Sequence, residues 1–137
     1  MNVKEVVPFL HVSSMERSIR FYIDGLGFTM KNKWEPDGEL RWCWLTLGGA
    51  SLMLQQFPKA PPANAGEGIN LTFMCDDAIA PYHQYRTRGL DPSEPEVGNG
   101  LWVTRVIDPD GSSSRVRQMW RRIRSCRRWC RRSRLEM

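Results

Sequence analysis

The strongest constraint on the fold is a pattern of secondary structure that occurs twice along the chain. An apolar strand at 6–12 is followed by a helix and by three further strand-like segments. After a connector rich in Pro, Gly and Ala at 58–68, the same order begins again with an apolar strand at 69–75. A repeat of this kind predicts an α+β chain of two similar modules, at about 4–57 and 68–111.

The first helix has a start signal and an apolar stripe. Ser13 and Glu16 have the spacing of a capping box. Met15, Ile19 and Tyr22 then recur at helical spacing. We therefore expect a helix that begins at Ser13 and covers one face of the sheet in its module.

The charge of the chain changes abruptly after Gly111. Residues 112–137 contain ten arginines and a single acidic residue, Glu136, whereas residues 1–111 contain ten basic and fourteen acidic residues and carry a charge of about −4. The basic character of the whole chain therefore belongs to its last segment. A basic patch spread over the fold, which nucleic-acid-binding domains use, is not expected in residues 1–111.

Cysteine spacing and hydropathy indicate the cellular compartment. The four cysteines form no C-x-x-C pair and no zinc spacing with the two histidines. No apolar run is long enough to span a bilayer, and the N-terminus lacks the apolar segment of a signal peptide. We expect a cytoplasmic protein with reduced cysteines and no membrane partner.

Three ordered motifs resemble those of a known superfamily. The segments "SMERSIRFYIDGLGF", "INLTFMCDD" and "VIDPDG" are similar to those of the vicinal oxygen chelate superfamily, which includes glyoxalases, bleomycin-resistance proteins and extradiol dioxygenases. The resemblance covers residues 4–111. It implies two βαβββ modules whose sheets curl into a cup, and a homodimer that completes the cup.

Strand alternation then indicates which side chains face the ligand, because the helices cover the other side of each sheet. The tryptophans on or beside strands add candidates for stacking, above all Trp42 and Trp44. His11 on this face is either a wall residue or a group that transfers protons. The expected ligand-binding residues are Val7, Phe9, His11, Trp42, Trp44, Met53, Gln55, Asn70, Thr72 and Trp102.

The resemblance also implies four metal-ligand positions, which fall on Val7, Gln55, Asn70 and Arg115. Valine cannot coordinate a metal, arginine is cationic, and the amides Gln55 and Asn70 are weak ligands. We therefore expect no cofactor, and the chain is most similar to the metal-free bleomycin-resistance branch. No nucleophile–base pair is visible, so no catalytic residue is assigned.

These expectations lead to one function and two alternatives. The chain is expected to bind a small organic ligand in a cup at a dimer interface without a metal, as a protein of the bleomycin-resistance kind. The first alternative is a metal-dependent lyase, isomerase or dioxygenase of the same superfamily. The second is nucleic-acid binding through the arginine-rich tail, which is expected only as a non-specific, salt-sensitive association.

The resemblance places the last strand of the second module just after Gly111, where no alternating apolar residues follow. We therefore expect this strand to be missing or replaced, and residues 112–137 to be disordered and to add little stability. One choice of synonymous codons for 112–130, read in a shifted frame, encodes Leu-Glu-Phe-Glu-Ser-Pro and then an acidic segment. We interpret the tail as an out-of-frame product; an arginine-rich arm for acidic partners is the alternative.

Overall fold

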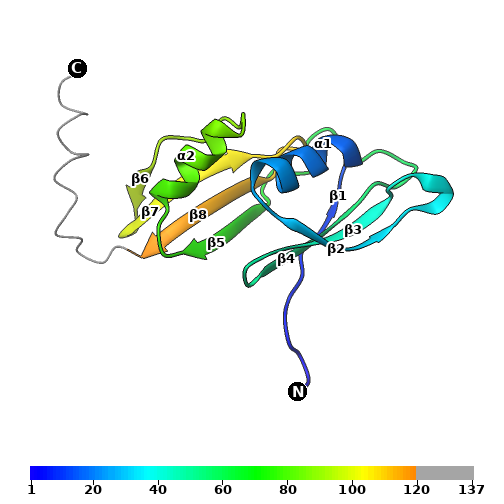
Figure 1. The fold of residues 1–137 in the computed structure, drawn as a ribbon, viewed down its shortest axis with the longest axis horizontal. Coiled ribbons are helices and arrows are strands. Elements are labelled where there is room, and N and C mark those ends of the chain that lie inside the picture. The colour runs from blue at the N-terminus through cyan, green and yellow to red at the C-terminus, as the bar shows by residue number, and fades with distance from the viewer. Residues whose placement is uncertain (120–137) are drawn as a thin grey trace.

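The computed structural model describes residues 1–119, which form two four-stranded sheets side by side (Figure 1). The first sheet has the order β1-β4-β3-β2, and the second has the order β5-β8-β7-β6. In both sheets the first strand of the module is parallel to the last, and the other pairs are antiparallel. This identical topology confirms the predicted pair of βαβββ modules. The strands are β1 (Phe9–His11), β2 (Thr29–Trp34), β3 (Trp42–Leu47), β4 (Ala50–Gln55), β5 (Asn70–Cys75), β6 (Glu96–Gly98), β7 (Leu101–Ile107) and β8 (Ser113–Met119).

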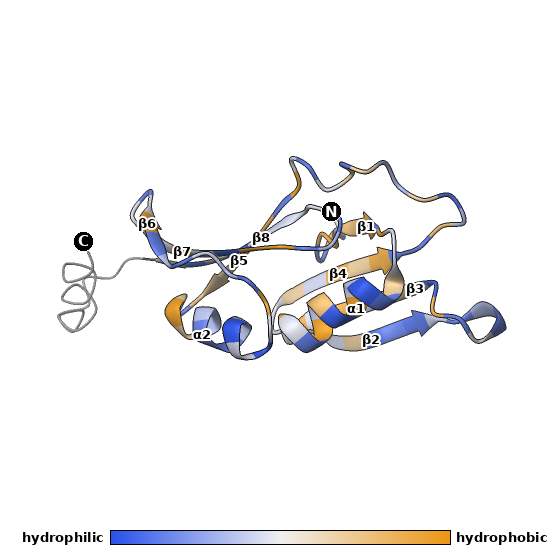
Figure 2. Cartoon of the chain, turned by 90° about the horizontal axis from the view of Figure 1, so that it is seen from above, coloured by the Kyte–Doolittle hydropathy of each residue, from blue (hydrophilic) through white to orange (hydrophobic). Residues whose placement is uncertain are grey.

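Each module has one main helix. The helical segments are α1 (Met15–Ile19), which continues as the π-helix η1 (Arg20–Gly25), the 3-10 turn η2 (Pro36–Gly38) and α2 (Ile79–Thr87). No helix within residues 1–119 is long and apolar enough to cross a membrane. Figures 1 and 2 show α1 and α2 each lying against its own sheet.

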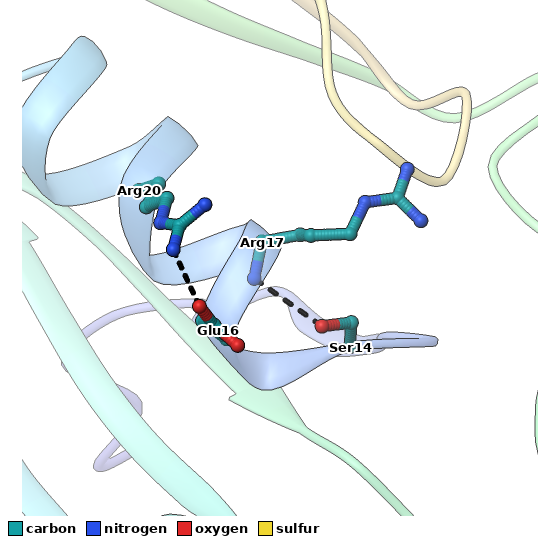
Figure 3. Close-up of polar contacts among 4 residues, drawn as sticks. All are labelled: Ser14, Glu16, Arg17 and Arg20. Atoms are coloured by element: carbon teal, nitrogen blue, oxygen red, sulfur yellow. Dashed lines mark hydrogen bonds and ion pairs between the residues drawn. The ribbon is translucent and has the colours of Figure 1, made fainter.

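The start of α1 differs from the predicted capping box. Ser14, not Ser13, is the N-cap, and its hydroxyl accepts a hydrogen bond from the Arg17 amide at 3.3 Å (Figure 3). Glu16 forms an ion pair with Arg20 one turn later rather than reaching back to the cap. The box prediction was wrong because the amide of Ser13 is used elsewhere, as described below.

The helix-facing sides of both sheets share one core. Leu45, Leu52 and Leu54 of the first sheet are fully buried, and Leu71 and Phe73 of β5 pack against the same cluster. Tyr22 of η1 is also fully buried there. The opposite faces of the two sheets are not covered by the helices and carry the side chains that alternate with the core residues.

The expectation was that the last strand of the second module is missing or replaced. A missing strand is wrong, because residues 113–119 form this strand, and these residues are not disordered as expected. β8 (Ser113–Met119) lies between β5 and β7, parallel to the first and antiparallel to the second. A strand can form here without apolar alternation because backbone hydrogen bonds to two neighbours fix it, and Ser112 and Ser114 are small enough to be buried. The second module therefore includes residues 113–119. The rest of the arginine-rich tail, 120–137, lies outside the described residues.

The "DPDG" turn after β7 joins the two modules. Asp108 is 5% exposed, and its carboxylate accepts hydrogen bonds from the Tyr22 hydroxyl at 2.7 Å and from the amides of Asp110 and Ser112 at 2.9 and 2.8 Å. The Asp110 carboxylate accepts a hydrogen bond from the Ser13 amide. Burial, reinforced by the charge of Asp108, raises the pKa of Tyr22, so its hydroxyl stays protonated and remains a donor.

The connector between the modules is held against this turn at Gly66. The Gly66 amide donates a hydrogen bond to the Asp110 carbonyl at 3.0 Å. A Cβ atom at Gly66 would lie 2.3 Å from the Ser112 nitrogen and 2.4 Å from the Asp110 oxygen. Only glycine permits this approach of two backbones.

Candidate functional site

The uncovered faces of the two sheets are the candidate site, and most of the predicted residues lie on them. On the first sheet, burial alternates so that every second side chain points away from the core. Cross-strand pairing sets Phe9, Met53 and Trp44 in one row, and His11, Gln55 and Trp42 in the next. We call this surface the first open face; its predicted members are Phe9, His11, Trp42, Trp44, Met53 and Gln55.

The first open face is richer in aromatic side chains than the sequence predicted. Phe57, which follows β4, packs edge-to-face on His11 with ring centroids 4.8 Å apart, and on Phe9 at 6.3 Å. Trp34 of β2 is paired with Trp42 and is 53% exposed. Alternation along β2 could have placed Trp34 on this face. Phe57 lies beyond the strand and gave no such signal.

A lysine also belongs to this face. The Nζ atom of Lys31 lies 4.4 Å from the centroid of the Trp44 ring. The pairing of β2 with β3 shifts between Met30 and Asn32, so Lys31 occupies a bulge. A bulge breaks the period of two, and for this reason strand alternation could not assign the lysine to a face.

Two ring nitrogens on the first open face are buried without a hydrogen-bond partner in the described structure. They are Nε2 of His11 and Nε1 of Trp44. An unpaired buried polar group costs about 1–3 kcal/mol. Such groups are unusual in a folded protein, and a bound ligand is one way in which they are paired.

Two hollows adjoin His11. The larger has a volume of about 510 Å³, which suits a small organic molecule. Its lining residues are His11, Phe57, Lys59, Ala60, Pro61 and Pro62. The smaller, of about 260 Å³, lies between β1, the connector and the "DPDG" turn, and Asp110 is part of its wall. A third hollow, of about 590 Å³, lies between the β3–β4 turn, β5 and α2, and its lining includes the predicted residue Thr72.

The second open face carries the predicted residues of β5. Asn70, Thr72 and Met74 are exposed on it, as alternation predicted. Beside Thr72 and Met74 lie Arg115 and Arg117 of β8. Arg105 of β7 pairs across the strands with Arg115 and forms an ion pair with Glu96.

Two predicted site residues lie elsewhere. Val7 precedes β1, in no strand. Trp102 lies on the helix-facing side of β7 and packs against the core. Its neighbour in the alternation, Thr104, donates a hydrogen bond to the Ala78 carbonyl at 3.0 Å, next to the start of α2. Trp102 was predicted as a site residue only because it is aromatic. The alternation of side chains along β7 contradicts this prediction.

The residues at the implied metal positions do not fit a divalent metal. Val7 offers no donor atom, Arg115 is cationic, and Gln55 and Asn70 are neutral amides on different sheets. The Asn70 amide nitrogen donates a hydrogen bond to the Gly68 carbonyl at 3.2 Å. Within residues 1–119, no three His, Cys, Asp or Glu side chains lie close enough to share one ion.

Comparisons with known proteins agree with this architecture. The family model of the Glyoxalase/Bleomycin resistance protein/Dioxygenase superfamily matches residues 5–114. No protein in a search of curated sequences matches the chain.

Several solved structures share the fold. The antibiotic binding protein TnmS3 from Streptomyces sp. CB03234 has a TM-score of 0.68 and 23% identity over 88% of this chain and 99% of its own. A bleomycin-binding protein complexed with bleomycin has a TM-score of 0.68 and 21% identity, covering 86% of this chain and 100% of its own. A bleomycin resistance determinant encoded on the transposon Tn5 has a TM-score of 0.69 and 21% identity, covering 85% and 98%.

Proposed function

We propose that this chain, which belongs to the Glyoxalase/Bleomycin resistance protein/Dioxygenase superfamily, binds a small organic ligand on its open faces. The observation that carries the proposal is the first open face, where aromatic side chains surround ring nitrogens that have no hydrogen-bond partner within the described part of the chain. Aromatic walls with a few placed polar groups are typical of small-molecule sites. Two structures that share the fold support the proposal, since TnmS3 is an antibiotic binding protein and the bleomycin-binding protein is complexed with bleomycin.

Replacement of Trp44 tests this function. Compounds that bind the native state raise the midpoint of thermal unfolding, so a panel of thiol conjugates, glycopeptide antibiotics and aromatic acids is screened first. We expect Trp44→Leu to weaken binding of a hit by about fivefold to tenfold, because aromatic stacking contributes roughly 1 kcal/mol. The control is Trp102→Phe, which alters an aromatic residue on the core side and should leave the affinity unchanged. Equal effects of the two variants would contradict the proposal.

We also propose that two copies of the chain bring their open faces together. Large apolar side chains are solvent-accessible on these faces: Trp34 is 53%, Met74 is 59% and Ile107 is 59% exposed. Apolar patches of this kind commonly mark an interface. The strands at the edges of both sheets, such as β2 and β6, would also gain partners or cover in such an assembly.

The proposed dimer needs no metal and resides in a reducing cytoplasm. The residues at the implied metal positions are not the ligands that Mg²⁺, Ca²⁺ or transition metals prefer in proteins. Both described cysteines, Cys43 and Cys75, are free thiols, which is the state that a reducing compartment maintains.

Native mass spectrometry measures the assembly and the metal together. We expect the purified full-length chain to have the mass of two subunits with no metal ion. A monomer at high protein concentration would contradict the dimer. One zinc, nickel, manganese or iron ion per subunit, retained after a chelator wash, would instead favour the metal-dependent enzymes of the superfamily.

Finally, we propose that residues 112–137 are read out of frame. Ser112 and Ser114 are 3% and 0% exposed, and the shifted frame has Leu and Phe at these two buried positions. Among residues 1–119, the Nε atoms of Arg115 and Arg117 are buried without hydrogen-bond partners. The backbone of β8 is therefore compatible with its position between two strands, whereas its polar side chains are not compatible with their buried surroundings. Sequencing the coding DNA decides this proposal, and finding no frame that encodes the alternating strand would reject it.

A further inference from the structure

The first open face carries cationic side chains that no acid neutralises. Lys31 lies over Trp44, and Lys59 lines the hollow beside His11. Within the described residues neither lysine forms an ion pair, whereas the neighbouring Lys33 is paired with Glu35. The nearby acid Asp110 already accepts the Ser13 amide through both of its oxygens. This surface is therefore positive on a body whose net charge is about −4.

One of the two buried ring nitrogens favours the same kind of ligand. Nε1 of an indole carries a hydrogen and can only donate, and in Trp44 it has no acceptor among residues 1–119. Nε2 of His11 is a second nitrogen without a hydrogen-bond partner among residues 1–119, and because it donates or accepts according to its tautomer, it does not select the charge of the ligand. A ligand that supplies oxygen acceptors would satisfy the indole donor, whereas an ammonium group would not.

The position of Lys31 adds discrimination by charge. Its ammonium group occupies the face of the Trp44 ring, so a ligand that stacks on this ring must draw the lysine aside. A carboxylate does so by forming an ion pair with Lys31. A cationic ligand must instead displace the like-charged ammonium group of Lys31. This displacement also breaks the cation–π contact between Lys31 and Trp44.

We infer that the ligand of the first open face is an aromatic or conjugated anion, such as an aromatic carboxylate. Its flat body lies against the aromatic side chains around Met53, and its acidic group is held by Lys31 or Lys59. This inference rests on the proposed function, because it names the chemical class of ligand for the same site.

The test compares three probes that share one aromatic body: naphthoate, naphthamide and naphthylmethylammonium. Calorimetric titration of the full-length chain in about 0.15 M salt keeps weak surface attraction screened. We expect naphthoate to bind about tenfold more tightly than the ammonium probe, with the amide between them. Lys31→Met and Lys59→Met should each weaken naphthoate binding by about threefold, as expected for exposed ion pairs.

Lys33→Met is the matched control. It removes the same charge from the same strand, but Lys33 is paired with Glu35, and we expect no change in naphthoate affinity. If the affinity for naphthoate is unchanged in both Lys31→Met and Lys59→Met, the anion is held elsewhere, for example by the arginines of the second open face, and the inference is wrong.

The remaining outcomes separate this inference from the proposed function. If the ammonium probe binds as tightly as naphthoate, or if none of the three probes binds, the ligand class is wrong. The proposed function then still stands as long as Trp44→Leu weakens a hit of a different charge. If no compound depends on Trp44, the proposed function fails, and the ligand class fails with it.

Discussion

Ending the chain at Gly111 is expected to abolish cooperative unfolding of the second module, whereas ending it at Met119 preserves it. β8 is paired along its length with β5 on one side and with β7 on the other. Its backbone makes about ten hydrogen bonds in such an arrangement, each contributing roughly 1 kcal/mol net. Their loss is comparable with the whole stability of a small domain, about 5–15 kcal/mol. Thermal and urea unfolding, followed by circular dichroism, measure the difference.

The full-length chain and a frame-restored chain complete this comparison. The restored chain should be the most stable, because a buried Leu and Phe contribute roughly 1.5–3 kcal/mol each. A variant ending at Gly111 that unfolds as sharply as the full-length chain, and at the same temperature, would show that β8 adds no stability. That result would restore the expectation drawn from the sequence.

Replacing Asp108 by Ala is expected to destabilise the chain by about 3–5 kcal/mol, because three donors lose their acceptor at about 1–3 kcal/mol each. These donors are the Tyr22 hydroxyl and the amides of Asp110 and Ser112. The midpoint of thermal unfolding should fall by about 10–20 °C. Since Tyr22 belongs to the first module, the transition should stay a single step if the turn couples both modules.

Tyr22→Phe separates the contribution of one donor. It removes the hydroxyl and leaves the hydrogen bonds that the Asp108 carboxylate accepts from two backbone amides. We therefore expect the free energy of unfolding to fall by about 1 kcal/mol. The double variant Tyr22→Phe/Asp108→Ala should cost less than the sum of the two single changes. Asp91→Ala, at an exposed position, is the control for loss of one negative charge. An Asp108→Ala variant as stable as this control would contradict the structural role.

The sequence predicted those parts of the fold that depend on periodicity. The repeat gave both modules, and alternation along β5 correctly separated Asn70 and Thr72 on the open face from Phe73 on the core side. These predictions succeeded because side chains alternate between the two faces of a regular strand. Once its apolar residues are assigned to the core, the face of every other residue follows.

Predictions failed where position depends on something other than a regular period. Lys31 reached the open face through a bulge, and Trp102 was assigned by residue type against the parity of its own strand. β8 was missed because its neighbours supply the hydrogen bonds, so its own side chains need no apolar pattern. Rules that consider only the local sequence of a strand do not include the hydrogen bonds that its two neighbouring strands provide.

The contact at Gly66 limits where this chain can change length. Residues before it in the connector lie on the surface in turns, and loops of this kind accept insertions at low cost. At Gly66 itself the two backbones leave no room for a side chain, since one added methyl group would meet the Ser112 nitrogen. Peptide tags, reporter domains or natural insertions should therefore be accepted around 58–64 and rejected at Gly66. Glycine at position 66 thus sets a boundary for both evolution and engineering.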